Sequence, residues 1–428
     1  MSLVDLDKQI IWHPLTQHKV TNDPVFIESG KGSYLYDDKG KEYIDLISSW
    51  WVNLYGHAHP KIAAAISAQA TKLEQIAFGG LTHGPAITLC DKMRSILPKE
   101  LSKFFFSDNG STSVEVALKI SYQYWKNKGE DKKLFLSFEG AYHGGTLGAM
   151  SVSGSGDSKD PFFQLFFDTL RVPYPDTWNG DGNIEEKEKI ALEVLNAHLD
   201  QHSDNIAALI IEPLMQGASG MRLCRHSFVQ ELVKTVRSHG ILIIFDEVMT
   251  GFGRTGSYFA MDQLDIVPDF LCVSKGITGG FLPLSLTVTR EEIYNEFLGD
   301  DLSRAFVHSH SYTANSIGCA AGIAAFDILV SEETKNAWAV INETHEKSLS
   351  EMIEKGCPIE NIRVLGTISA FDLIGERSWS EMQKMRLKLL EEGLILRPLG
   401  NTLYIMPPYS TSQEALRKSY SIISKMIL

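Results

Sequence analysis

The sequence predicts an α/β fold: a large domain around a mostly parallel sheet, joined to a small domain of mixed helices and strands. Short apolar runs alternate with helical patterns between residues 104 and 288, which is typical of a sheet covered on both faces. After about Ser331 the pattern becomes helical and later returns to strands. We therefore expect a strand-rich segment 1–59 belonging to the small domain, a large domain over 60–330 and a C-terminal small domain over 331–428.

The N-terminal segment should contain a hairpin. The runs Ser33–Tyr36 and Glu42–Asp45 flank the polar turn at residues 37–40, which ends in glycine. After Pro60 apolar residues recur at helical spacing, and this predicts a helix over Lys61–Ile76.

The elements of the large domain follow in order. The predicted strands are Phe104–Phe106, Leu134–Phe138, Ala207–Ile211, Ile241–Phe245, Phe270–Val273 and Ser285–Val288. The predicted helices are Val114–Lys126, Glu186–Leu199 and Phe228–Ser238. The polar stretch Ser151–Asp160 is expected to be a mobile loop. In the C-terminal domain, Arg363–Leu373 and Thr402–Ile405 are candidate strands.

Composition narrows the class of protein. The 428 residues carry 40 Lys and Arg against 53 Asp and Glu, a net charge of −13, which argues against nucleic acid or anionic membranes as partners. The five cysteines are widely spaced without a CxxC pair, so neither a disulfide framework nor a metal site is expected. The start of the sequence has no signal-peptide pattern, and no apolar stretch is long enough to span a bilayer. We expect a soluble, cytoplasmic protein.

Two apolar strands end in groups that carry chemistry. Asp246 and Glu247 follow one buried run, and Lys275 follows another. Ligands of open α/β sheets bind at the carboxyl ends of strands, and a desolvated lysine can act as a nucleophile. The carboxylates can equally be a helix cap or a structural ion pair, and the lysine can be an ordinary solvated side chain.

Two further strands end in polar, glycine-containing turns. Residues 107–111 lead into a helix whose free N–H groups, with the Ser111 hydroxyl, make a candidate phosphate cradle, although a helix capped by Thr112 with Glu115 explains the same residues. Tyr142 stands between glycine-containing turns after the run 134–138, where it can stack on a planar ring or simply pack.

One motif points elsewhere. Residues 251–256 match G-x-G-x-x-G, but five residues separate them from the strand and no helix start follows, so a dinucleotide site is not favoured.

The features at the strand ends fit one shared ligand. A lysine, a carboxylate, an aromatic ring and a phosphate cradle at successive strand ends are together what pyridoxal 5'-phosphate requires.

The same residues carry a family resemblance over nearly the whole chain. Glu212-Pro213, the segment Phe245–Gly256 and Ser274-Lys275-Gly276 resemble the signature of class III aminotransferases of fold type I. Within that class, further motifs resemble the members that aminate 8-amino-7-oxononanoate in biotin synthesis with S-adenosylmethionine as donor. These motifs are Trp12-His13-Pro14, Ser48-Ser49-Trp50-Trp51, Phe78–His83, Arg397-Pro398 and Met406–Tyr409.

The resemblance implies a role for each matching residue. Lys275 would form the Schiff base with the cofactor, Asp246 would hold the pyridine nitrogen, and Tyr142 would lie against the ring. Gly110 and Ser111 would bind the phosphate. Trp50, Trp51, Leu15 and Ser309 would line the substrate pocket and Arg397 would bind the carboxylate of the keto acid. Family members are homodimers, and His310 with Ser311 aligns with the motif that contacts the phosphate of the partner subunit.

Three positions depart from the family pattern. Leu15 replaces an aromatic residue, Gly145 replaces an acidic one, and His310-Ser311 replaces Pro-Thr. The first two bear on the amino donor, so lysine remains an alternative to S-adenosylmethionine. The chain could also be a different ω-aminotransferase acting on a diamine or ω-amino acid, an aminomutase or racemase, or a non-catalytic binding protein on the same fold.

Overall fold

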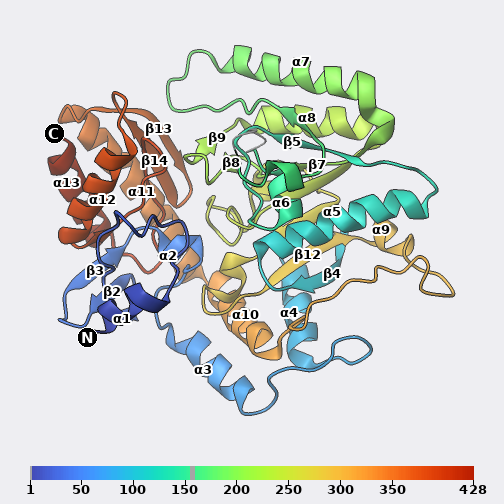
Figure 1. The fold of residues 1–428 in the computed structure, drawn as a ribbon, viewed down its shortest axis with the longest axis horizontal. Coiled ribbons are helices and arrows are strands. Elements are labelled where there is room, and N and C mark those ends of the chain that lie inside the picture. Colours follow the sequence, from blue (N-terminus) through green and yellow to red (C-terminus); the bar gives the residue numbers. More distant parts are fainter. Residues whose placement is uncertain (1, 155–159) are drawn as a thin grey trace.

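A seven-stranded sheet forms the centre of the computed structural model, which describes residues 2–154 and 160–428 (Figure 1). The strands lie in the order β4, β12, β11, β10, β7, β5, β6. Their bounds are β4 (Leu101–Ser107), β5 (Leu134–Phe138), β6 (Thr169–Val172), β7 (Ile206–Ile211), β10 (Leu242–Asp246), β11 (Phe270–Val273) and β12 (Ser285–Arg290). Only β12 runs antiparallel to its neighbours, and every other pair in the sheet is parallel. The predicted α/β class with a mostly parallel sheet is confirmed.

The six apolar runs singled out in the sequence all form strands of this sheet, within a few residues of their expected bounds. The sequence prediction missed β6, which pairs only with β5 and lies at the edge of the sheet. Three of its four residues are only partly buried. An edge strand needs less apolar sequence than a central one, so its pattern is weak.

Helices cover both faces of the sheet. Ile243 and Phe245 pack in the same apolar cluster as α8 (His226–Ser238), whereas Leu242 and Ile244 pack in the cluster that contains α5 (Gly110–Asn127). This alternation follows from the two-residue period of a strand. Figure 1 shows α5 crossing one face of the sheet. The remaining helices of this region are α4 (Gly84–Arg94), α6 (Leu147–Val152), α7 (Ile184–His202), α9 (Glu291–Asn295) and α10 (Ser316–Leu329).

The helix expected over Lys61–Ile76 is shorter in the structure. It is α3 (Pro60–Ala70), and the prediction of its end was wrong. The chain turns after it because the carbonyl of Leu73 accepts hydrogen bonds from the Gln69 amide and from the Ser316 hydroxyl at the start of α10. A tertiary contact therefore ends a helical pattern that the sequence alone would continue.

The predicted N-terminal hairpin is confirmed. It consists of β2 (Tyr34–Asp37) and β3 (Glu42–Asp45), preceded by β1 (Ile27–Lys31). Strand β3 also pairs in parallel with β15 (Leu394–Ile395). The two ends of the sequence thus share one sheet, and Figure 1 shows the blue and red segments side by side.

The C-terminal region is helical and then stranded, as expected. The single strand predicted over residues 363–373 is instead a hairpin of β13 (Ile359–Leu365) and β14 (Ile368–Leu373), which continues into β16 (Thr402–Ile405). Gly366, with φ of +56°, makes the turn, and the N–H of Thr367 donates to the carbonyl of Arg254. The helices are α11 (Glu332–Glu354), α12 (Trp379–Glu391) and α13 (Gln413–Ile427).

The other elements are short. They are α1 (Leu3–Ile10), α2 (Ser48–Trp51), β8 (Met215–Gln216), β9 (Arg222–Leu223) and the 3₁₀ turns η1 (Phe163–Leu165), η2 (Ser203–Asn205), η3 (Ala260–Gln263) and η4 (Lys275–Thr278). Of the predicted loop 151–160, Ser151 and Val152 belong to α6, and residues 155–159 lie outside the described residues. Within the described part of the chain, every helix is too short or too polar to cross a bilayer.

Candidate active site

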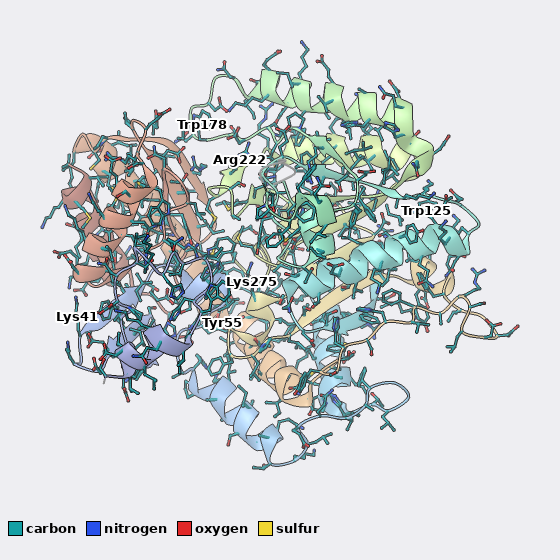
Figure 2. All side chains as sticks on the ribbon, in the orientation of Figure 1. Lys41, Tyr55, Trp125, Trp178, Arg222 and Lys275 are labelled. Carbon is teal, nitrogen blue, oxygen red and sulfur yellow. The ribbon has the colours of Figure 1, made fainter. Side chains whose placement is uncertain are left out.

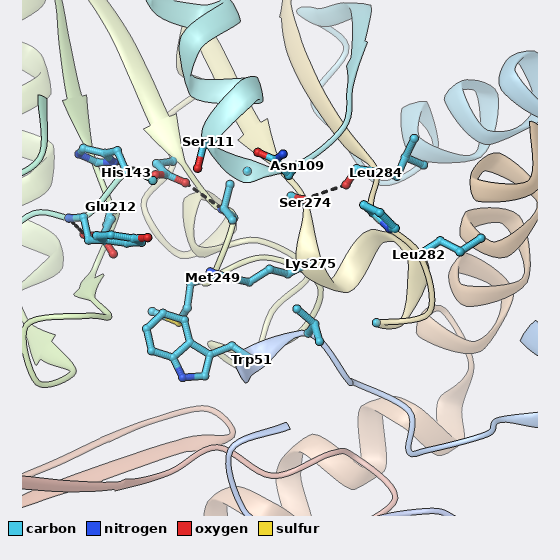
Figure 3. Close-up of a pocket in the computed structure, with 18 of the residues that line it drawn as sticks. Trp51, Asn109, Ser111, His143, Glu212, Met249, Ser274, Lys275, Leu282 and Leu284 are labelled. Carbon is cyan, nitrogen blue, oxygen red and sulfur yellow. Dashed lines mark hydrogen bonds and ion pairs between the residues drawn. The ribbon is translucent and has the colours of Figure 1, made fainter. Parts of the chain in front are cut away.

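A cavity of about 420 Å³ lies where the parallel strands end (Figure 3). Its walls come from the residues that follow β4, β5, β7, β10 and β11, and from the turn before β12. Figure 2 places Lys275, one of its residues, near the middle of the molecule. The chemically important lining residues are Trp51, Asn109, Gly110, Ser111, Tyr142, His143, Glu212, Asp246 and Lys275. The structure therefore brings six of the predicted site residues to one cavity, namely Trp51, Gly110, Ser111, Tyr142, Asp246 and Lys275.

Asp246 is held in a buried, oriented position at the end of β10. Its Oδ2 accepts a hydrogen bond of 2.7 Å from Nδ1 of His143, and its Oδ1 accepts one of 3.0 Å from the backbone of Val248. Both side chains of the carboxylate–imidazole pair are almost completely buried. The pair fixes the plane of the carboxylate, whose residue lines the cavity.

Glu247, the second carboxylate of the motif, faces away from this cavity. It accepts hydrogen bonds from the backbone N–H groups of Ala260 and Met261 and from the hydroxyl of Thr250. Burial raises its pKa to about 8. The sequence allowed a purely structural role for both carboxylates. Glu247 has such a role, whereas Asp246 lines the cavity.

Lys275 begins η4, with one residue between it and the end of β11, and lines the cavity. Its Nζ lies 4.7 Å from the centre of the Trp51 ring, and Figure 3 shows the Trp51 ring below the Lys275 side chain. Its backbone has φ of +44°, a left-handed conformation that a non-glycine residue adopts at a cost. Burial lowers the pKa of Lys275 to about 8, although the negative charges of Asp246 and Glu212 oppose that shift. The amine is therefore far easier to deprotonate than that of a solvated lysine.

Glu212 adds a second acidic group to the cavity wall. Its two oxygens accept hydrogen bonds from the N–H groups of Tyr142 and Gly217, at 3.0 and 2.9 Å. Burial raises the pKa of Glu212 to about 7. The side chain ties the loop after β5 to the loop after β7, so it shapes the wall on which Tyr142 stands.

The start of α5 opens into the cavity. Asn109 is its N-cap and accepts from the N–H of Thr112, while the Thr112 hydroxyl accepts from the N–H of Asn109. Among the described residues, the N–H groups of Gly110 and Ser111 have no acceptor. Free N–H groups at a helix start form an anion site.

The capping box predicted for Thr112 and Glu115 was wrong. Asn109 provides the cap one turn earlier than expected. The Glu115 carboxylate instead accepts from the Thr146 hydroxyl and from the N–H groups of Gly148 and Ala149 at the start of α6. A carboxylate is favourable at either helix start, and only the tertiary structure decides between them.

Tyr142 lines the cavity with 47 % of its surface exposed. Burial and the nearby charges of Asp246 and Glu212 raise the pKa of its hydroxyl. The ring is thus available on one side, which is compatible with either a ligand contact or simple packing.

The predicted substrate residues Trp50 and Arg397 lie beside the cavity rather than in its lining. The Arg397 guanidinium stacks 4.2 Å from the centre of the Trp50 ring. Trp51, the neighbour of Trp50, reaches the cavity and donates from Nε1 to the Tyr404 hydroxyl at 3.0 Å.

Four other predicted residues are not brought to the cavity within one chain. Leu15 is 78 % exposed. Ser309 and Ser311 are exposed, and the His310 ring lies 3.8 Å from the carboxylate of Asp108. The predicted roles of Ser309, His310 and Ser311 depend on a second chain, and they and the predicted role of Leu15 in the substrate pocket stay predictions.

His143 and Glu212 were not predicted as site residues from the sequence. The position of His143 in the sequence could have identified it as a site residue. It follows a parallel strand, and residues in that position lie at the binding edge of the sheet. Glu212 follows the apolar run 207–211 in the same way. The G-x-G-x-x-G segment contributes nothing to this cavity, and its Arg254 is buried with Nη1 donating to the carbonyl of Pro407.

Known proteins share this fold and this sequence pattern. The model of the class III aminotransferase family matches residues 15–427, and the chain belongs to that family. It is 45 % identical to the adenosylmethionine-8-amino-7-oxononanoate aminotransferase of Synechococcus elongatus, over 97 % of this chain and 98 % of that protein.

Solved structures agree with the assignment. The adenosylmethionine-8-amino-7-oxononanoate aminotransferase of Methanocaldococcus jannaschii superimposes with a TM-score of 0.91 at 32 % identity, covering 99 % of this chain and 98 % of that one. An amine transaminase from an uncultivated Pseudomonas species, in its PLP-bound form, matches with a TM-score of 0.90 at 28 % identity, covering 98 % of each chain. The fold is that of the aminotransferases, whose substrates are small molecules.

Proposed function

We propose that this chain transfers an amino group to 8-amino-7-oxononanoate, forming 7,8-diaminononanoate for biotin synthesis. The observation that carries the proposal is the cavity in which Lys275 and Asp246 meet beside the open start of α5. The full-length similarity to enzymes named for this substrate supports the choice of acceptor.

The cavity residues fit pyridoxal 5'-phosphate. The free N–H groups of Gly110 and Ser111, at the start of a long helix, suit its phosphate. The buried carboxylate of Asp246 suits a protonated ring nitrogen, since a buried charge needs a partner. When bound, the cofactor supplies an electron sink that stabilises negative charge on the substrate carbon.

The protein side chains then have distinct tasks. The Nζ of Lys275 attaches the cofactor and moves a proton at the reacting carbon, a role that its low pKa of about 8 favours. Asp246, oriented by His143, keeps its charge directed at the ring nitrogen. The ring of Tyr142, which lines the cavity wall, would stack on the cofactor.

Arg397 is the proposed site for the carboxylate of the oxo-acid. Its guanidinium forms no ion pair among the described residues and keeps a planar fork beside the cavity, stacked on Trp50. Arginine binds carboxylates through two parallel hydrogen bonds. The Trp50 and Trp51 rings supply apolar surface for the carbon chain.

Replacing Arg397 tests this function. We expect Arg397→Ala to raise the KM for 8-amino-7-oxononanoate strongly, because losing one partner of a buried charge pair costs about 2–5 kcal/mol. The KM of a donor that does not use this arginine should stay unchanged. Steady-state kinetics with both substrates measures the effect.

The matched control is Arg386→Ala, which removes a nearby, partly buried arginine whose pKa is lowered by burial and by the charge of Arg397. It should leave the KM for the oxo-acid near the wild-type value. An unchanged KM in Arg397→Ala would show that Arg397 does not bind the oxo-acid. If the wild type does not turn over the oxo-acid, the proposed acceptor is wrong.

S-adenosylmethionine is the proposed amino donor, and lysine is the second candidate. Leu15 and Gly145 favour lysine because they lack the aromatic and acidic groups expected there, and Gly145 contributes only a backbone N–H, which donates to the Ser111 hydroxyl at 3.0 Å. Mixing the cofactor-loaded enzyme with each donor and following its absorbance decides between them. Gain of S-adenosylmethionine use in Leu15→Tyr would place the choice at that position.

The proposal includes a homodimer in the cytoplasm, built from a large domain over 60–330 and a small domain formed by 1–59 and 331–428. The pairing of β3 with β15 supports the grouping of the two ends. In the dimer, Ser309, His310 and Ser311 would approach the cavity of the partner, since they lie outside the cavity of their own chain.

A further inference from the structure

The segment Ser48–Trp51 forms a turn of left-handed conformation. Its four consecutive residues have φ values of +49°, +46°, +72° and +72°, and none of them is glycine. Each such residue brings its Cβ too close to the backbone, so a run of four persists only where the surroundings hold it. Strain of this kind gathers at functional sites.

Asp45 holds the turn from the strand before it. This carboxylate is fully buried, and its Oδ1 accepts from the N–H of Ile47. Its Oδ2 accepts from the Ser49 hydroxyl at 2.8 Å and from Nε2 of His57 at 3.1 Å. From the other side, the Ser48 hydroxyl donates to the carbonyl of Met406 at 2.8 Å.

The held turn places two neighbouring indoles against the two cations of the site. Trp51 covers the amine of Lys275 at 4.7 Å, and Trp50 covers the guanidinium of Arg397 at 4.2 Å. In an extended strand, adjacent side chains would point to opposite faces. The turn thus links the end of β11 to the segment after β15 through two aromatic contacts.

We propose that this turn is a ruler that sets the spacing between Lys275 and Arg397, and so selects the chain length of the amino or oxo acid. Asp45 and His57 are positioning residues, because they act through the turn. The inference rests on the proposed function, in which the reacting carbon lies at Lys275 and the carboxylate at Arg397. A chain of the wrong length cannot satisfy both ends, and misplacement is costly for reaction rates.

The test uses straight-chain ω-amino acids from 4-aminobutyrate to 8-aminooctanoate as donors to the cofactor-loaded enzyme, followed by absorbance in single turnovers. We expect one length to react at least roughly tenfold faster than the shortest. An alkylamine without a carboxylate, such as 1-aminohexane, should show no dependence on the turn.

Two variants of exposed Ser49 separate strain from general damage. Ser49→Ala loses the hydrogen bond to Asp45 but keeps the strained Cβ, so the turn should relax and the length preference should flatten. Ser49→Gly loses the same bond but adopts positive φ without strain, so it should retain more of the preference than the alanine variant. Ser350→Ala, an exposed serine on α11, is the matched control and should behave as the wild type.

A second readout needs no turnover. In the cofactor-free protein, the near-UV circular dichroism of the tryptophans should weaken in Ser49→Ala and be largely kept in Ser49→Gly. If Ser49→Ala matches the wild type in both readouts, the turn has no such role. A wild type that aminates 8-amino-7-oxononanoate but converts the ω-amino acids without length preference, or converts none of them, would overturn the ruler alone. A wild type that does not turn over 8-amino-7-oxononanoate would overturn the ruler together with the proposed function.

Discussion

At the scale of single residues, the two adjacent carboxylates at the end of β10 have different surroundings. Asp246 pairs with His143 at the cavity, and Glu247 receives backbone N–H groups from η3. We expect Asp246→Asn to bind the cofactor but to lose about a hundredfold or more in rate, since a neutral amide removes the charge that stabilises the reacting system. Single-turnover absorbance measures the rate, and a cofactor titration measures binding.

Glu247→Gln is the matched control for this prediction. Glu247 lies next to Asp246 but outside the cavity lining, and glutamine keeps the size of its side chain while removing its charge. The rate should stay near that of the wild type. Equal losses of rate in both variants would contradict a special role for Asp246.

The lowered pKa of Lys275 predicts that the rate of cofactor attachment depends on pH. In the cofactor-free protein the attachment of pyridoxal 5'-phosphate needs a neutral amine, so its rate should rise with pH and level off above about 8. A solvated lysine would continue to gain rate until about pH 10.4. Attachment to a free alkylamine, measured in parallel by absorbance, corrects for the ionisation of the cofactor itself. A continued rise to pH 10 would mean that the amine is not desolvated.

The Lys275 amine also makes the free energy of unfolding depend on pH. Between pH 8 and about pH 10.4 the unfolded chain binds more protons at Lys275 than the folded chain. This contribution therefore makes the cofactor-free protein more stable as the pH rises through that window. As the pH falls through the same window the gain is lost, and the loss is complete below about pH 8.

At the scale of elements, α5 combines a structural cap with a proposed phosphate site. We expect Asn109→Ala to lower the free energy of unfolding by about 0.5–2 kcal/mol, because it removes the acceptor for the Thr112 N–H. It should also weaken cofactor binding, since the frayed helix start no longer presents the N–H groups of Gly110 and Ser111. Denaturant unfolding of the cofactor-free protein and a cofactor titration measure the two effects.

Ser378→Ala provides the comparison. It removes the capping box of α12, whose Ser378 and Glu381 lie outside the cavity, at a similar cost in stability. Cofactor affinity should not change. If both variants weakened binding equally, general loss of stability would explain the result and the phosphate site at α5 would be wrong.

At the scale of the whole molecule, the proposed dimer shares its active sites. Ser311→Asp places a negative charge where the phosphate of the partner is expected, and Lys275→Ala removes the amine. Mixing the two inactive variants should restore activity, because one site of each mixed dimer then carries neither change. With random exchange half of the dimers are mixed, so about a quarter of the sites recover.

A mixture of Lys275→Ala with Asp246→Asn is the control, since both changes then affect sites built by their own chains and no site is intact. Subunit exchange is verified with two affinity tags. Exchange without recovery in the Ser311→Asp mixture would show that each site is built from one chain.

The sequence alone determined the class of fold, the strands that end at the cavity, and the position of Lys275, Asp246 and the turn before α5 at the ends of those strands. These features are local: buried strands need apolar runs, and the residues after parallel strands meet at one edge. Because spacing along the chain predicts them, the six apolar runs and the hairpin at residues 34–45 agree with the structure.

Only the tertiary structure decided which interpretation holds at each ambiguous position. Contacts with distant residues ended α3 at Ala70, divided the run 363–373 into a hairpin, and directed the Glu115 carboxylate to the start of α6. They also paired His143 with Asp246 and turned Glu247 away from the cavity. The physical reason is shared: a polar group takes the partner that burial leaves available, and that partner lies far away in the sequence.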